Sequence, residues 1–250
     1  MDIAVAGATG TIGAEVVRVA AERGHGVRSI SRAAGVDVIY GRGLDDALRG
    51  SDAVIDVLSI STLSAQKSIA FFEQTTGRLM QAERRVHVPH HLVLSIVGID
   101  RAPYGYYAGK VAQELAVEAG GVPWTILRAT QFHDFARQMF HRTDLGPIHP
   151  VVTAHLQPVD ISEVAMRLVD LVERGPSGRA RDLAGPRREE LGAMMRLWAR
   201  ETGARAWMPR VIFPGSVGIA MRDGLMLPGP DSDLGQITFA DWVARQTAGR

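Results

Sequence analysis

The feature that most constrains the fold is a glycine-rich turn within the first thirteen residues. A short apolar run at residues 3–6 leads into the segment Gly7-Ala-Thr-Gly10-Thr-Ile-Gly13, and apolar residues at three- and four-residue spacing follow. An apolar run of this length that ends in glycine is typical of a buried parallel strand that enters a turn directly. The start of the chain therefore predicts a strand, a tight turn and an amphipathic helix.

Alternating strands and helices continue to about residue 130. Strands are predicted at residues 3–6, 27–30, 36–40, 53–58, 92–97 and 124–127, and helices at 11–23, 65–85 and 104–119. This alternation favours right-handed β-α-β crossovers and a parallel sheet covered on both faces. The predicted fold class is therefore α/β, a Rossmann-like doubly wound parallel sheet.

The glycine turn also predicts a ligand. In a doubly wound sheet, the turn between the first strand and the first helix holds a dinucleotide pyrophosphate against backbone N–H groups. Gly7 permits the tight turn, Gly10 leaves room for a phosphate, and Gly13 lets the helix pack closely on the strand. The expected cofactor-binding residues of the turn are Gly7, Thr9, Gly10, Thr11, Ile12 and Gly13. A purely structural turn is the alternative, but the position between a strand and a helix disfavours it.

Arg32 bears on which nicotinamide dinucleotide is bound. After the second strand, an acidic residue would bind a ribose 2′-hydroxyl, whereas a basic residue would bind a 2′-phosphate. Ser31 and Arg32 follow that strand, and the first acidic residue is Asp37. Arg32 is therefore predicted to bind the phosphate, so NADP(H) is preferred and NAD(H) is the alternative cofactor. A solvated surface arginine is the structural alternative.

Ser95, Tyr106 and Lys110 form the predicted catalytic set. Ser95 lies near the carboxyl end of the strand at 92–97, where such sheets bind ligands. Tyr106 and Lys110 are four residues apart and share one face of a helix. A nearby ammonium would lower the pKa of the tyrosine and favour proton exchange with a carbonyl or alcohol oxygen. Lys110 is also expected to contact the cofactor ribose, and packing is the alternative role for Tyr106.

The spacing Gly-x-x-Gly-x-x-Gly, with a later serine and Tyr-x-x-x-Lys, resembles the atypical short-chain dehydrogenases/reductases and, among them, the NmrA-like NAD(P)-binding group. The resemblance implies that Leu58 and Ser59 border the cofactor. It also implies that Gln131 and Phe132 lie beside the nicotinamide. NmrA-like proteins often lose the tyrosine, so the resemblance allows either turnover or dinucleotide binding alone.

The pattern changes after residue 132. Helices are predicted near residues 160–174, 188–203 and 238–246, and an apolar stretch with glycine and proline breaks covers 208–230. We interpret residues 1–132 as the NAD(P)-binding Rossmann domain. Residues 133–250 are interpreted as a smaller α/β substrate-binding cap, continuous with the first domain because no linker separates them. The apolar stretch weakly favours a hydrophobic small-molecule substrate.

The amino-acid composition limits the kinds of partner that this protein is expected to bind. The formal net charge is +1, without the basic surplus typical of nucleic-acid-binding proteins. The chain has no cysteine, which excludes disulfides, thiolate nucleophiles and cysteine-ligated metals. It has neither an apolar run long enough to cross a membrane nor a signal-peptide pattern, so we expect a cytoplasmic protein without a membrane partner. It is expected to act as a monomer or a homodimer.

His87, His90 and His91 precede the strand at 92–97, at its amino end and away from the expected ligand edge. No carboxylate accompanies them at ligand spacing, so we predict a solvated loop cluster and no metal site. His133 follows Phe132 near the expected nicotinamide, but a structural role is favoured over substrate contact.

Two functions follow from these residues. The first is an NADP(H)-dependent oxidoreductase that reduces a carbonyl, quinone or similar small molecule by hydride transfer. The second is an NmrA-like redox sensor that binds dinucleotide without chemistry. Retention of Tyr106 and Lys110 favours the enzyme. A sugar-nucleotide epimerase is less favoured, because the C-terminal region is short for a nucleotide sugar.

Overall fold

A parallel sheet forms the centre of the molecule, which the computed structural model describes over residues 1–211 and 215–248. Its strands are β1 (Asp2–Ala6), β2 (Gly26–Ile30), β3 (Ala53–Asp56), β4 (His91–Ile96), β5 (Trp124–Ala129), β8 (Gly178–Arg179), β9 (Leu183–Ala184) and β12 (Asp233–Leu234). Neighbours follow the order β12-β9-β5-β4-β3-β1-β2, and β8 pairs with β5. These pairings are parallel, which confirms the predicted doubly wound α/β fold.

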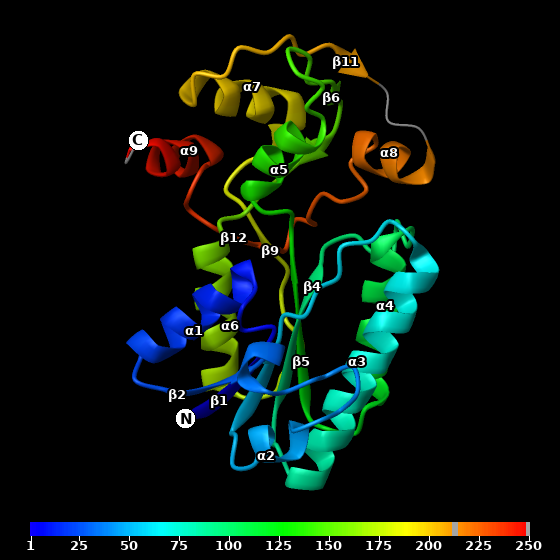
Figure 1. Ribbon diagram of the computed structural model, residues 1–250, viewed down its shortest axis with the longest axis vertical. Coiled ribbons are helices and arrows are strands. Elements are labelled where there is room, and N and C mark those ends of the chain that lie inside the picture. The colour runs from blue at the N-terminus through cyan, green and yellow to red at the C-terminus, as the bar shows by residue number, and fades with distance from the viewer. Residues whose placement is uncertain (212–214, 249–250) are drawn as a thin grey trace.

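Helices cover both faces of this sheet (Figure 1). The helices α1 (Thr11–Glu22) and α6 (Ile161–Arg174) pack together on one face, whereas α2 (Leu44–Leu48), α3 (Ala65–Val86) and α4 (Tyr106–Ala119) lie on the other. In β1, Ile3 and Val5 join the core with α1 and α6, and Ala4 and Ala6 join the core with α3. Successive side chains of a strand point to opposite faces, so the apolar run at the start of the chain reflects burial on both sides.

A second group of helices stands over the carboxyl ends of the strands (Figure 1). It contains α5 (Asp134–Arg142), α7 (Leu191–Glu201), α8 (Gly215–Arg222) and α9 (Phe239–Thr247). Two short strand pairs accompany them, β6 (Val151–Val152) with β11 (Arg210–Val211), and β7 (His155–Leu156) with β10 (Glu189–Glu190). Phe140, Trp198 and Trp242 belong to a separate apolar core here, so this group is stabilised by its own packing.

The chain after residue 132 does not stay in that second group. It returns to the main body through α6, β8, β9 and β12, which pack on or extend the sheet. The predicted apolar stretch 208–230 includes residues 212–214, which lie outside the described residues. No helix in the described ranges combines the length and the apolar character needed to span a membrane.

The strand predicted at residues 36–40 is wrong. Val36 and Val38 are buried, as they would be in a strand, but the chain folds back through a bridge between Asp37 and Arg42. The Asp37 carboxylate accepts hydrogen bonds from the backbone N–H groups two and three residues later, at 3.0 and 3.2 Å. This local bonding closes a turn in place of a sheet ladder. The valines therefore reach the core from a loop, and β2 remains at the edge of the sheet.

The ends of two elements also differ from the prediction. The helix α4 begins at Tyr106 and not at residue 104, because Gly105 has a φ of 55° and a ψ of −124°, which are not helical. The strand β3 ends at Asp56 and not at residue 58. The Asp56 carboxylate accepts a hydrogen bond from the Leu58 N–H at 2.9 Å, so the chain turns away from the sheet there.

Candidate cofactor and substrate site

The predicted glycine turn lies at the carboxyl end of β1, and its geometry depends on the glycines. Gly7 has a φ of 87°, which favours glycine, and a Cβ atom there would lie 3.1 Å from the Val57 carbonyl oxygen. A Cβ atom on Gly13 would overlap the backbone of Gly7, so α1 can approach β1 only without a side chain. The Gly10 N–H donates to the Gly7 carbonyl oxygen at 2.9 Å and closes the turn.

The amino end of α1 is open to an anionic ligand. Gly10 is the N-cap residue and makes no side-chain bond to the first N–H groups of the helix. Thr9, Gly10 and Thr11 are exposed, and the first turn contains no acidic residue. Unpaired N–H groups and the helix dipole attract anions to such an end. The turn therefore fits the pyrophosphate of a nicotinamide dinucleotide.

Arg32 lies just beyond the carboxyl end of β2. It begins the short 3-10 helix η1 (Arg32–Ala34), and its side chain is exposed. The Gly7 N–H donates to the Ile30 carbonyl oxygen at 3.1 Å, which holds the end of β2 against the glycine turn. Arg32 is thus an exposed cation on the segment that adjoins the turn.

A cavity of about 970 Å³ lies between the carboxyl edge of the sheet and the second group of helices. Among its lining residues are the predicted residues Ile12, Leu58, Ser59, Ser95, Tyr106, Lys110, Gln131 and Phe132. The other predicted residues, Gly7, Thr9, Gly10, Thr11, Gly13 and Arg32, are not among the lining residues in the described part of the chain. The fold therefore collects the expected catalytic and nicotinamide residues in one cavity.

Tyr106 lines this cavity, with its hydroxyl 3.1 Å from Ser59 Oγ. Burial raises the pKa of Tyr106, and the hydrogen bond with Ser59 opposes this only in part. The predicted lowering of this pKa by Lys110 is therefore wrong. Its phenol stays protonated near neutral pH and can donate a hydrogen bond into the cavity.

The Lys110 ammonium lies between α4 and the sheet and forms hydrogen bonds with both. It is 3% exposed, and it donates to the Leu94 carbonyl oxygen at 2.7 Å and to the Gln113 amide oxygen. The Gln113 amide nitrogen donates in turn to the buried Asp56 carboxylate at 2.9 Å. Burial lowers the pKa of Lys110 to about 8, although Asp56 opposes the shift. Lys110 and Tyr106 share a helix, but these partners draw the ammonium toward the sheet.

Two buried side chains line the cavity without a hydrogen bond of normal geometry to any described residue. Ser95 is 2% exposed and lies beside the Glu114 carboxylate, whereas Gln131 is 9% exposed and lies beside the Tyr107 phenol. Buried polar groups are nearly always hydrogen-bonded, so such atoms at a cavity mark places where a ligand can supply the partner.

Two histidines at the amino end of β4 are buried, so the predicted solvated cluster is wrong for them; His87 is exposed. His90 Nε2 lies 2.9 Å from Thr125 Oγ1, and His91 Nδ1 lies 2.8 Å from Glu83 Oε1, which α3 brings over the strand. Burial lowers the pKa of His90 to about 4. Burial also acts to lower the pKa of His91, but the Glu83 carboxylate raises it overall. In the described residues, no three His, Asp or Glu side chains gather as a metal site.

His133 has the structural role favoured by the sequence. It is 1% exposed, and its Nε2 lies 3.0 Å from the Ile237 carbonyl oxygen. Its ring centre is 5.8 Å from that of Phe239 and 6.1 Å from that of Trp242. These contacts place it in the core of the second helix group.

Sequence reasoning missed one wall of the cavity. The helix α5 contributes Phe135, Gln138, Met139 and Arg142, and residues 60–63 after β3 contribute a further segment. The positions 135, 138, 139 and 142 recur at three- and four-residue intervals, which is the signal of one helix face. A polar and a charged residue interrupt this face, so its apolar pattern is weak in the sequence.

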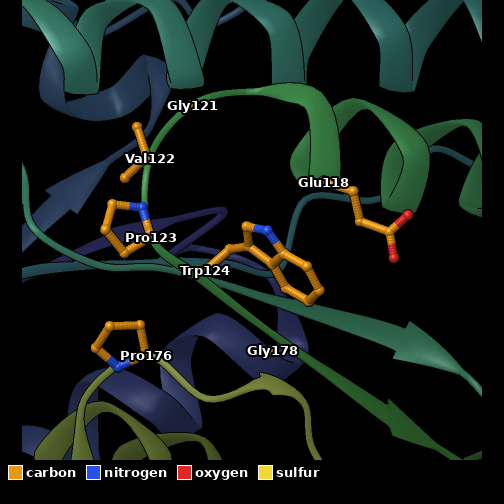
Figure 2. A pocket seen from close by; sticks show the side chains of 7 residues that line it. All are labelled: Glu118, Gly121, Val122, Pro123, Trp124, Pro176 and Gly178. Carbon is orange, nitrogen blue, oxygen red and sulfur yellow. The ribbon is translucent and has the colours of Figure 1, made fainter.

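A second hollow, of about 580 Å³, lies at the opposite end of β5 (Figure 2). It is lined by Glu118, Gly121, Val122, Pro123, Trp124, Pro176 and Gly178. The Glu118 carboxylate accepts a hydrogen bond from Arg179 at 2.6 Å. Among the described residues, the lining contains no buried polar side chain without a partner. This hollow therefore lacks the features that mark the cavity at the carboxyl edge.

Several solved structures share the fold at low sequence identity. An NADPH-dependent quinone oxidoreductase of Escherichia coli, complexed with NADPH, aligns with a TM-score of 0.77 and 15% identity over 98% of this chain and 99% of that chain. A UDP-N-acetylglucosamine 4-epimerase of Bacillus cereus aligns with a TM-score of 0.72 and 16% identity over 100% and 98%. A short-chain dehydrogenase/reductase superfamily protein of Agrobacterium tumefaciens with bound NAD aligns with a TM-score of 0.70 and 16% identity over 100% and 97%.

No curated protein matches the sequence. A family model described as NAD(P)H-binding matches residues 7–170, from the glycine turn into α6. The match begins at Gly7 and covers more than half of the chain. The fold and the open end of α1 agree with it. The chain therefore belongs to the NAD(P)H-binding family, and it shares its fold with NAD(P)-binding structures that include a short-chain dehydrogenase/reductase superfamily protein.

Proposed function

We propose that this protein is an NADP(H)-dependent oxidoreductase that reduces a carbonyl, quinone or similar small molecule. The observation that carries the proposal is the Tyr106 phenol, which lines the cavity together with the buried side chains of Ser95 and Gln131. A phenol, a serine hydroxyl and an amide N–H can each donate a hydrogen bond to a reacting oxygen. The glycine turn at the same edge supports a dinucleotide as the source of reducing equivalents.

Reduction of a carbonyl needs a hydride on carbon and a proton on oxygen. The reduced nicotinamide, when bound, supplies the hydride and becomes the oxidised dinucleotide. We assign the proton to the Tyr106 phenol, which yields an alcohol, or a hydroquinone from a quinone. Ser59 is exposed and lies 3.1 Å from the phenol, so it can pass a proton from solvent back to the phenolate. In this proposal Lys110 is a positioning residue that holds α4 against β4.

Replacement of Tyr106 by phenylalanine tests the acid role. With NADPH and a panel of quinones and aldehydes, we expect kcat of Tyr106→Phe to fall by about 100-fold or more, as for loss of a general acid. The dissociation constant for NADPH should stay within about twofold, because the phenyl ring keeps the packing. Tyr40→Phe, at an exposed position outside the lining of the cavity, is the matched control. Full reductase activity in Tyr106→Phe would refute the assignment.

Replacement of Arg32 by alanine tests the cofactor preference. A charge-assisted hydrogen bond contributes about 1.5–3 kcal/mol, so Arg32→Ala should weaken NADPH binding about 10- to 100-fold. The affinity for NADH, which has no 2′-phosphate, should change little. Equal effects on both dinucleotides would remove the basis for preferring NADP(H).

A second candidate is a redox sensor that binds dinucleotide without turnover. The observation that favours it is the Lys110 ammonium, which donates to Leu94 and Gln113 and makes no hydrogen bond with the Tyr106 hydroxyl in the described part of the chain. Cofactor binding with no NADPH oxidation by any quinone or aldehyde of the panel would favour the sensor over the enzyme.

A further inference from the structure

One face of α5 forms a wall of the cavity. Phe135, Gln138, Met139 and Arg142 all line it. The neighbouring face places Ala136 and Phe140 in the core of the second helix group, against which Phe135 and Met139 also pack in part. The side of α5 that faces the cavity therefore begins with an apolar ring and ends with a guanidinium.

The charges around the cavity are of one sign. In the described part of the chain, the charged lining residues are Lys110 and Arg142, and neither an aspartate nor a glutamate lines the cavity. The Lys110 ammonium is buried and already bonded to Leu94 and Gln113. Arg142 is exposed and thus remains as the accessible cation of this wall.

Arg142 also differs from its neighbour on the same helix. Arg137 is paired with Asp134, whose other oxygen accepts from Gln138 at 2.8 Å. Arg142 makes no ion pair or side-chain hydrogen bond with any residue in the described ranges. A guanidinium presents several N–H donors in a plane that suits the two oxygens of a carboxylate. The carboxyl end of α5 carries about half a negative charge, which the full charge of Arg142 exceeds.

The spacing along α5 gives the length of the wall that this helix contributes. Phe135 and Arg142 are seven residues apart, which is about 10 Å at 1.5 Å per residue. Phe132 and Gln131, at the end of β5, begin the same wall on the side of the expected nicotinamide. A molecule bound along this wall would thus have a polar group at each end of an apolar body.

We propose that Arg142 binds the carboxylate of an amphipathic substrate whose apolar body lies along Phe135 and Met139. This inference rests on the proposed function for the identity of the other end, where the reducible carbonyl lies near Gln131 and Tyr106. The substrate class is an aromatic or aliphatic carboxylate that carries a carbonyl at the end of its apolar body remote from the acid. Neutral quinones and aldehydes then bind more weakly than their carboxylated counterparts.

The test uses ligands that cannot be reduced, so it does not depend on turnover. Binding of biphenyl-4-carboxylate and of its neutral methyl ester is measured by calorimetry, with and without NADP⁺. We expect the carboxylate to bind about 10-fold more tightly or better, as for a charge-assisted hydrogen bond. Arg142→Gln should abolish the preference while leaving ester binding unchanged, and Arg142→Lys should keep part of it. Arg137→Gln is the matched control, and a thermal unfolding curve checks that each variant folds.

The outcomes separate this inference from the proposed function. Equal binding of acid and ester, binding of neither, or a preference that survives in Arg142→Gln would each overturn the inference. A preference that depends on Arg142, without reduction of 4′-formylbiphenyl-4-carboxylate, would support the carboxylate site and count against the oxidoreductase. Reduction of that aldehyde and its methyl ester with equal KM would support the oxidoreductase and overturn the carboxylate site.

Discussion

The two ends of the central sheet differ in what lies beside their buried polar groups. At the amino end, His90 and His91 each have a protein partner on one ring nitrogen, the other nitrogen of each ring has none in the described residues, and Glu118 accepts from Arg179. At the carboxyl end, Ser95 and Gln131 line a cavity without a hydrogen bond of normal geometry to a described residue, and α1 begins without a side-chain cap. Polar groups at the first end stabilise the fold, whereas those at the second are available to ligands.

The largest expected effect lies at the amino end. His91→Leu leaves the fully buried Glu83 carboxylate without its partner, which should cost about 3–5 kcal/mol of unfolding free energy in urea titrations. The double variant Glu83→Leu, His91→Leu should recover most of this loss, because no buried charge remains. The affinity for NADPH of the folded protein should be unchanged. A specific loss of affinity would show that this end also serves the ligand.

Lys110, which lines the cavity at the carboxyl end, should give a pH-dependent effect on stability of about 3 kcal/mol, from a pKa lowered from 10.5 to about 8. Between these pH values the unfolded chain holds the proton and the folded chain releases it, so stability rises with pH. Relative to Lys110→Met, the wild type should therefore gain stability from pH 8 to pH 10.5. Lys67→Met, at an exposed position of α3, is the control. A constant difference would mean that the ammonium is not buried in solution.

Gly13→Ala should act on both ligand binding and the fold. The added Cβ would overlap the Gly7 backbone, and overpacking of this kind costs about 1–3 kcal/mol. Because the overlap displaces the glycine turn, NADPH binding should weaken strongly at a temperature where the variant is folded. Gly77→Ala in α3, where a Cβ meets nothing within 4 Å, should keep binding and gain up to about 1 kcal/mol. Equal NADPH affinity in both variants would separate the turn from the cofactor.

The smallest effect is expected at the hollow of Figure 2. Glu118→Gln removes a partly exposed ion pair with Arg179, which should cost less than about 1 kcal/mol. The variant should bind NADPH and the carboxylate probe as the wild type does. Any change in ligand affinity would show that this hollow takes part in binding.

Much of the fold was predictable because its signals are local. The glycine turn, the strand at β5 and the helix α3 follow from spacing and apolar runs, and the structure has them within a few residues. The segment at 36–40 failed, because burial of Val36 and Val38 is compatible with both a strand and a loop. The hydrogen bonds of the Asp37 carboxylate stabilise the loop, and the spacing of apolar residues in the sequence does not reveal such bonds.

The residues of the cavity could be predicted from the sequence better than the hydrogen bonds that those residues make. The sequence places Ser95, Tyr106 and Gln131 at one edge, since the carboxyl ends of parallel strands and the helices that follow them meet there. It does not give the direction of the Lys110 ammonium, which depends on Gln113 and on Asp56 from another strand.

The sequence by itself determined the backbone conformation of the glycine turn. Glycines at 7, 10 and 13 act through the absence of side chains, and that absence is visible in the sequence. Only the tertiary structure decided which side chains lack partners, because a partner such as Glu83 for His91 comes from another element. The exposed guanidinium of Arg142 is likewise a feature that only the tertiary structure identifies. It can act as a ligand-binding group only because it lies beside a cavity whose other walls come from distant parts of the chain.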